Sequence, residues 1–273
     1  MIKSTAIKQD LQIARKHKFL NRQGLNMAVR FSKTNINLAK GNIFILHGFA
    51  SSMDEHYISS FSITLNKLGF NTISIDATNS FNSAEGNISN HSYDTHYNDL
   101  EDAINWSQKE YNIKEPFALM GHSLGAMACL LYAQNHLDQI SFIITASAII
   151  SGELLEKAYR ENIPKIYNKW KSTDNQNFTS NIPPYQKGSR KFSWLTSMAK
   201  HNTIKDAANI KSPTLMIAGT SDSRSPLEYQ HKLYNSLTCK KQISSIESAG
   251  HIFNNQETKK SAEIIKNWIN NNF

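Results

Sequence analysis

The pattern Gly121-His122-Ser123-Leu124-Gly125 carries more information about the fold than any other part of the sequence. It directly follows an apolar run that ends at Met120 and precedes a helix-like stretch over residues 124–136. In such a strand–turn–helix context the serine lies at a sharp, strained turn, and the flanking glycines avoid clashes with the strand and the helix. We therefore expect Ser123 at the carboxyl edge of a sheet and at a helix N-terminus, where backbone N–H groups favour a developing negative charge.

Short, continuous apolar runs recur along the chain, as is typical of strands buried on both faces of a parallel sheet. They lie at residues 42–47, 72–75, 116–120, 140–145 and 214–218, with a weaker run at 242–246. Segments with helical periodicity lie between and after them, including 58–68, 100–106 and 262–269. The alternation predicts an α/β fold with a mostly parallel sheet and helices on both faces. Residues 19–31 predict a β-hairpin, because two apolar runs flank a polar turn that ends in Gly24.

The stretch from residue 151 to residue 212 interrupts this alternation, because it contains no clear strand. A loop of that length without structure would be unusual, so we expect an inserted, mainly helical cap on a core of residues 1–150 and 213–273. The insertion holds 11 Lys and Arg against 5 Asp and Glu, which is most of the chain's net charge of +8. Its outer face is then either simply solvated or favours an anionic substrate or leaving group.

Aromatic residues are frequent in this insertion, and two roles are open for them. They either line a substrate pocket or form the small core of the cap itself. The residues concerned are Trp170, Tyr185, Phe192 and Trp194.

A nucleophilic serine needs a base and an orienting acid, and in the chain order Ser, Asp/Glu, His the acid follows a late strand. Asp222 comes directly after the run at 214–218, and His251 lies between the last predicted strand and the last helix. These positions predict Ser123, Asp222 and His251 as the catalytic residues. The alternatives are His96 as base and Glu228 or Glu247 as acid, but neither glutamate has the post-strand loop position.

A second donor to the reaction's oxyanion should come from the loop after an early strand. His47-Gly48-Phe49 ends the run at 42–47, and Gly48 allows the backbone to turn tightly. The backbone N–H groups of Phe49 and Leu124 are therefore expected to converge on the substrate oxygen. We interpret His47 as a buried structural histidine rather than as a second base.

Together these motifs resemble those of the α/β-hydrolase superfamily, in the superfamily's order, from about residue 42 to the C-terminus. The resemblance implies an eight-stranded sheet, a cap inserted after the sixth strand, and the triad Ser123, Asp222 and His251. Within the superfamily the chain is most similar to bacterial carboxylesterases of the cinnamoyl/feruloyl-esterase-like branch. It departs from them after the fourth strand, where Asp76 and Gly86 remain but the intervening glycines of the usual loop are replaced.

The implied activity is hydrolysis of small carboxylic esters through an acyl-enzyme, which requires no metal or cofactor. A thioesterase, an acyltransferase or an amidase would use the same triad. A ligand-binding receptor on a hydrolase fold is a further alternative, because fold alone does not imply activity.

Composition limits the remaining classes. Hydrophobic residues make up 40% of the 273 residues, so a sizeable core can form. The two cysteines, Cys129 and Cys239, form neither a disulfide framework nor a spaced metal cluster.

The sequence also limits the expected partners and location. No basic run is interleaved with aromatic residues as in proteins that bind single-stranded nucleic acid, so nucleic acid is not an expected partner. No apolar run approaches a membrane span, and residues 1–18 do not resemble a secretory signal, so we expect a cytoplasmic protein. Oligomeric state is left open.

Overall fold

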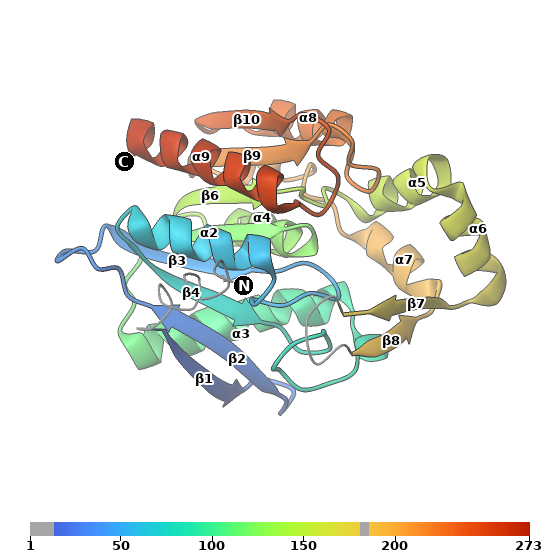
Figure 1. Ribbon diagram of the computed structural model, residues 1–273, viewed down its shortest axis with the longest axis horizontal. Helices are drawn as coiled ribbons and strands as arrows, with labels where there is room; N and C mark the ends of the chain where they lie inside the picture. The colour runs from blue at the N-terminus through green and yellow to red at the C-terminus, as the bar shows by residue number, and fades with distance from the viewer. Residues whose placement is uncertain (1–13, 181–185) are drawn as a thin grey trace.

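The computed structural model describes residues 14–180 and 186–273. Eight strands form one sheet in the order β1-β2-β4-β3-β5-β6-β9-β10 (Figure 1). The strands are β1 (Arg15–Leu20), β2 (Asn26–Ser32), β3 (Gly41–Leu46), β4 (Phe70–Asp76), β5 (Phe117–His122), β6 (Ile140–Ala146), β9 (Thr214–Gly219) and β10 (Lys241–Ile246). In this order, every neighbouring pair of strands from β4 through to β10 is parallel. Strand β2 pairs antiparallel with both β1 and β4. The predicted α/β-hydrolase fold and the hairpin at its start are both confirmed.

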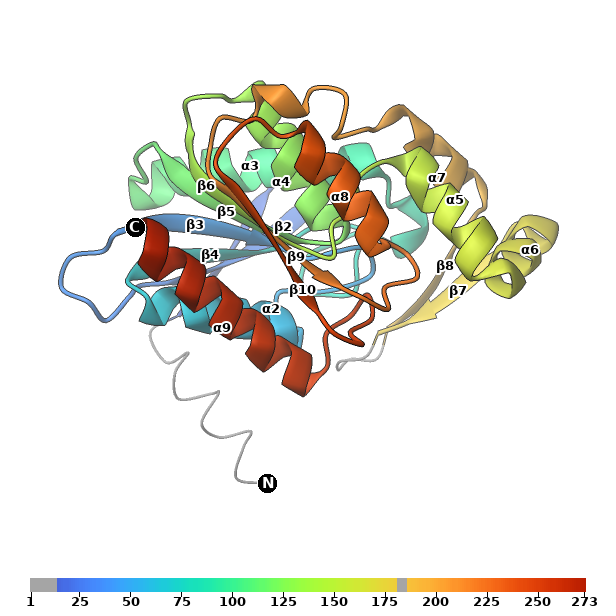
Figure 2. The same cartoon turned by 90° about the horizontal axis from the view of Figure 1, so that it is seen from above.

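Helices cover both faces of this sheet (Figure 2). Helices α2 (His56–Lys67) and α9 (Asn255–Asn272) pack on one face, over the core cluster that contains Phe61 and Trp268. The opposite face is covered by α3 (Tyr93–Tyr111), α4 (Leu124–Asn135) and α8 (Leu227–Ser236). The short 3-10 helix η1 (Ile88–Asn90) precedes α3. Burial of the central strands on both faces explains their continuous apolar runs.

The order of the strands places the functional site. Strands β3 and β5 are neighbours at the centre, and the chain runs outward from them in opposite directions along the sheet. In open α/β sheets, ligands bind at the carboxyl ends of the strands where the order reverses in this way. Gly48 follows β3 and Ser123 follows β5, so both motifs lie at this point.

The segment between β6 and β9 extends from one end of the sheet (Figure 1). Its helices are α5 (Gly152–Asn162), α6 (Pro164–Thr173), α7 (Ser193–Ser197) and the 3-10 helices η2 (Met198–Lys200) and η3 (Ala207–Asn209). It also contains a two-stranded antiparallel sheet of β7 (Gln176–Thr179) and β8 (Lys187–Arg190). The segment is mainly helical, as expected, but the sequence pattern did not indicate this strand pair. Each strand is only four residues long and mostly polar, so neither carries an apolar alternation that sequence reasoning could detect.

Among the residues that the structure describes, no helix is long and apolar enough to cross a membrane. The predicted absence of a secretory signal concerns residues 1–18, of which 1–13 lie outside the described residues, as does Tyr185.

Candidate active site

Ser123 occupies a strained backbone conformation between β5 and α4. Its φ is 55° and its ψ is −116°, a region that residues other than glycine rarely adopt. The two neighbouring glycines make this turn possible by close packing. A Cβ atom on Gly121 would lie 2.4 Å from the backbone nitrogen of Ala126, and one on Gly125 would lie 2.4 Å from the carbonyl oxygen of His47. The turn therefore tolerates no side chain at either position.

The structure brings Ser123, His251 and Asp222 together in one hydrogen-bonded chain. The Ser123 hydroxyl lies 2.8 Å from Nε2 of His251. Nδ1 of the same ring lies 2.9 Å from Oδ2 and 3.1 Å from Oδ1 of Asp222. Ser123 and Asp222 are buried, and the His251 side chain is 10% exposed. With Nδ1 protonated toward the carboxylate, Nε2 is free to accept the proton of the serine hydroxyl.

Asp222 is held in its ionised form by the groups around it. Burial alone would raise the pKa of Asp222, but the charge and hydrogen bond of His251 and backbone donors oppose it, and the net pKa is lowered. Those donors are the backbone N–H groups of Arg224 and Ser225, each 2.9 Å from Oδ1. Asp222 is therefore ionised at neutral pH and fixed in orientation.

Two backbone N–H groups flank the serine. Leu124 is the first residue of α4, and Phe49 lies in the loop after β3. Neither amide donates a hydrogen bond within residues 14–180 and 186–273, so both are free to donate to a ligand. The same loop approaches Ser123 closely through Gly48, on which a Cβ atom would lie 2.9 Å from the Cβ atom of Ser123.

His122 has a structural role that its position in the motif did not reveal. Its ring is buried, and Nε2 donates a hydrogen bond to the carbonyl oxygen of His251, 2.9 Å away. Burial lowers the pKa of His122 to about 3, so the ring is neutral and keeps this donor in place. His122 thus holds the backbone of His251, while Asp222 holds its ring.

The two other histidines that the sequence analysis considered, His47 and His96, are fully buried. His47 is buried and places Nδ1 2.7 Å from the carbonyl oxygen of Gly48, while Nε2 accepts from the backbone N–H of Ala77 at 3.2 Å. His96 donates through Nε2 to the carbonyl oxygen of His47, 3.0 Å away. Burial lowers the pKa of both rings, and that of His96 to about 3. Both are structural histidines that shape the loop after β3.

The alternative acids are not part of this arrangement. Glu228 lies in the first turn of α8 and Glu247 follows β10, and both are exposed. Within the described part of the chain, neither forms a hydrogen bond or an ion pair with His251.

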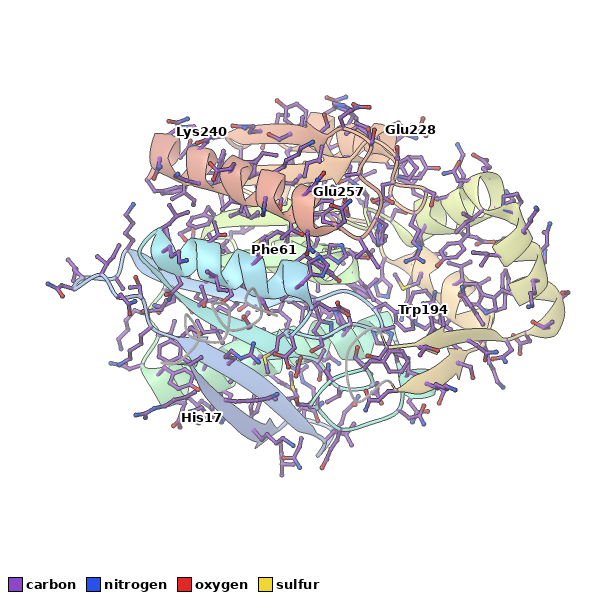
Figure 3. The ribbon with its side chains drawn as sticks, in the orientation of Figure 1. His17, Phe61, Trp194, Glu228, Lys240 and Glu257 are labelled. Carbon is purple, nitrogen blue, oxygen red and sulfur yellow. The ribbon has the colours of Figure 1, made fainter. Side chains whose placement is uncertain are left out.

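A cavity of about 210 Å³ opens above Ser123 and His251. Apolar and aromatic side chains line it, together with Arg190, Arg224 and Glu55. Trp194 is one of the lining residues, and Figure 3 shows it where α7 meets the β7–β8 sheet. Phe192 is not among the described lining residues. It packs instead against Tyr167 and Trp170, with ring centroids 5.4 and 5.5 Å apart.

Sequence reasoning missed Arg190 and Arg224 as cavity residues. Arg190 is the last residue of strand β8, which the sequence did not predict. Arg224 lies in the loop after Asp222. No pattern distinguishes either from the other Lys and Arg residues of the chain. In the described ranges, no group of three or more His, Cys, Asp and Glu side chains is arranged to bind a metal ion.

A model of the family described as serine aminopeptidase, S33, matches residues 37–257. The chain belongs to this family. It is an α/β hydrolase, as its motifs indicated, and the fold of solved relatives agrees with this assignment. Comparison with curated proteins gave no match.

Three solved structures illustrate how this α/β hydrolase resembles known ones. Est1E from Butyrivibrio proteoclasticus, with ferulic acid bound, is 17% identical, with a TM-score of 0.73 over 93% of this chain and 97% of that one. Mouse α/β hydrolase domain-containing protein 10 is 15% identical, with a TM-score of 0.71 and coverages of 94% and 99%. An esterase from Pyrococcus furiosus is 17% identical, with a TM-score of 0.69 and coverages of 96% and 93%. At such low sequence identities, these similarities show a shared fold and nothing more specific.

Proposed function

We propose that this protein hydrolyses small carboxylic esters through an acyl-enzyme formed on Ser123. The observation that carries the proposal is the hydrogen-bonded chain from Ser123 through His251 to Asp222, at the base of a cavity. An exposed or isolated serine would lack a base within hydrogen-bond reach, whereas this hydroxyl has one at 2.8 Å.

The first half of the reaction acylates the serine. His251 takes the proton of Ser123 at Nε2 while the hydroxyl oxygen attacks the ester carbonyl carbon. Asp222 holds the ring in the Nδ1-protonated tautomer and stabilises the imidazolium that forms. The negative charge on the tetrahedral oxygen is stabilised by the N–H groups of Phe49 and Leu124, and one such donor contributes about 3–4 kcal/mol in the transition state.

The second half releases the acyl group. The imidazolium of His251 returns its proton to the leaving alcohol oxygen as the carbon–oxygen bond breaks. A water molecule then attacks the acyl-enzyme, with the same ring as base, and the acid leaves as Ser123 recovers its proton.

The cavity favours a small substrate. Its volume of about 210 Å³ lies below the roughly 300 Å³ at which pockets for drug-sized ligands begin. Apolar side chains such as Ile149, Leu155 and Phe178 line it, as suits the hydrocarbon part of an ester. Two structural relatives, Est1E with bound ferulic acid and the Pyrococcus furiosus esterase, support the choice of an ester substrate.

A second candidate is a peptidase, which the family description favours and which would use the same triad. An aminopeptidase must bind the substrate's ammonium group, and Glu55 is the one carboxylate among the described lining residues. Burial raises the pKa of Glu55 and so opposes its charged form, which weakens ammonium binding. The ester therefore remains the first proposal.

The test is hydrolysis of p-nitrophenyl esters from acetate to palmitate by the wild type and by Ser123→Ala. We expect turnover of the shortest esters that is abolished in the variant. Aminoacyl p-nitroanilides, measured in parallel, test the peptidase alternative. If neither series is hydrolysed and a fluorophosphonate fails to label Ser123 in folded protein, the proposal is overturned.

A further inference from the structure

The side chain of Arg190 lies inside a cluster of four aromatic rings in the wall of the cavity. Arg190 ends strand β8 and is 4% exposed. Its guanidinium carbon lies 3.7 Å from the centroid of a Trp194 ring, 4.0 Å from that of Phe49, 4.6 Å from that of Trp170 and 4.7 Å from that of Phe178. Phe49, Phe178, Trp194 and Arg190 all line the cavity that also contains Ser123.

This guanidinium has no acidic partner among the residues that the structure describes. Within the described ranges no carboxylate lies within 4.0 Å of it. Nη2 donates to the Tyr159 hydroxyl and to Oε1 of Gln176, both neutral and both 3.3 Å away. Nε and Nη1 are buried and have no acceptor in the described part of the chain. Burial lowers the pKa of Arg190 to about 9, so the side chain still carries its positive charge at neutral pH.

Packing alone does not account for a charged residue here. Stacking on aromatic faces offsets part of the cost of burying a cation, but a lone buried charge still requires a partner to be stable. A methionine or leucine would fill the same ring cluster without that cost. The buried positive charge therefore indicates that its ionic partner is a group of a bound ligand.

The other charged residues of the cavity wall favour an anion. Arg224 adds a second positive charge, and the carboxyl group of Glu55 has a raised pKa because it is buried. Residues 151–212, which include Arg190, also carry 11 Lys and Arg against 5 Asp and Glu. The described lining thus presents more positive than negative charge to whatever enters.

We propose that Arg190 binds a carboxylate of the substrate, so that the preferred substrates are small esters that also carry a free carboxylate. This inference rests on the proposed ester hydrolysis at Ser123, since it names the substrate class of the same site. The small cavity requires the carboxylate and the ester group to belong to one short molecule. A guanidinium suits this task because its donors match the geometry of a carboxylate and remain charged.

The test compares esters that differ only in charge. One pair is 4-acetoxybenzoate against 4-acetoxybenzamide, with the carboxylate on the alcohol side. The other is monomethyl succinate against methyl succinamate, with the carboxylate on the acyl side. We expect the wild type to prefer the anionic member of at least one pair by about tenfold or more in kcat/KM, since hydrogen bonds to charged groups are the stronger ones.

Variants separate recognition from packing. Arg190→Met should abolish the preference, because kcat/KM should fall more for the anionic ester than for the neutral one. Arg190→Lys should retain part of the preference, because it keeps the charge. Arg160→Met is the matched control, because Arg160 lies on the exposed surface of α5 and should leave the preference unchanged.

Direct binding provides a readout that does not depend on turnover. In calorimetric titration, 4-hydroxybenzoate or succinate should bind the wild type more tightly than 4-hydroxybenzamide or succinamide does, and Arg190→Lys should keep part of this difference. Equal hydrolysis and equal binding of charged and neutral partners, with Ser123 active, would overturn the role of Arg190 and leave the esterase intact. A failure of the esterase proposal would instead appear as absence of Ser123-dependent turnover on all esters.

Discussion

A Cβ atom placed on Gly48 would lie 2.9 Å from the Cβ atom of Ser123, closer than two such carbons approach in folded proteins. The loop after β3 and the turn after β5 therefore touch at a position where only glycine fits. Because Phe49 directly follows Gly48, we expect this contact to position its N–H group relative to the serine hydroxyl. The geometry around the proposed oxyanion thus depends on a residue that offers no side chain at all.

Gly48→Ala should lower kcat/KM for a p-nitrophenyl ester by about a hundredfold. The added methyl group forces the two loops apart, and misplacement by about 1 Å is sufficient for a loss of this size. The rate of fluorophosphonate labelling of Ser123 should fall in parallel, while the melting temperature shows that the variant is folded. Activity at the wild-type level would show that the loop can move without affecting the site.

Asp222→Asn should lower kcat by about 10³–10⁴-fold with little change in fold. The amide cannot hold the His251 ring in the Nδ1-protonated tautomer, nor stabilise the imidazolium. Steady-state hydrolysis at neutral pH measures the effect. Glu228→Gln is the matched control, since this exposed carboxylate does not contact His251. A loss of less than tenfold in the Asp222 variant would contradict the orienting role.

Gly125→Ala should destabilise the fold by several kcal/mol or prevent soluble expression. Its Cβ atom would lie 2.4 Å from the carbonyl oxygens of Leu46 and His47, both of them backbone atoms that cannot move aside cheaply. Gly250→Ala is the natural comparison, because among the described residues no heavy atom outside the adjacent residues lies within 4 Å of a Cβ atom there. Urea denaturation of both variants measures the difference. Equal stabilities would show that the turn can relax.

The free energy of unfolding should fall as the pH drops below about 6.5. His96 and His122 are neutral in the folded protein, where burial lowers their pKa to about 3, but they take up protons near pH 6.5 in the unfolded chain. Between these values the unfolded state binds more protons, so stability decreases toward acid. From pH 7 to pH 5 the two rings together should cost about 4 kcal/mol.

Urea denaturation at a series of pH values measures this loss. His96→Gln should remove part of the pH dependence, because its amide can donate to the carbonyl oxygen of His47 without titrating. His231→Gln, a change at an exposed histidine of α8, should leave the dependence as in the wild type. An unchanged slope in His96→Gln would exclude His96 as a contributor to the pH dependence.

Most of the core fold could be predicted from the sequence. The continuous apolar runs became the parallel strands β3 to β6, β9 and β10, since burial on both faces leaves that pattern. The Gly-x-Ser-x-Gly turn could be placed because its steric requirements are local. The proximity of Asp222 and His251 could also be predicted, because both lie in loops after parallel strands and such loops meet at one edge of the sheet.

The contacts that give the site its shape could not be predicted from the sequence and became visible in the folded protein. The short polar strands β7 and β8 pair with each other, and no apolar pattern in the sequence indicated them. Trp194 faces the cavity whereas Phe192, two residues away, packs within the insertion. The burial of Arg190 among rings from distant segments, and the hydrogen bond from His122 to His251, likewise join residues that are far apart in the chain. Composition and periodicity describe each segment separately, whereas these contacts depend on how the segments pack together.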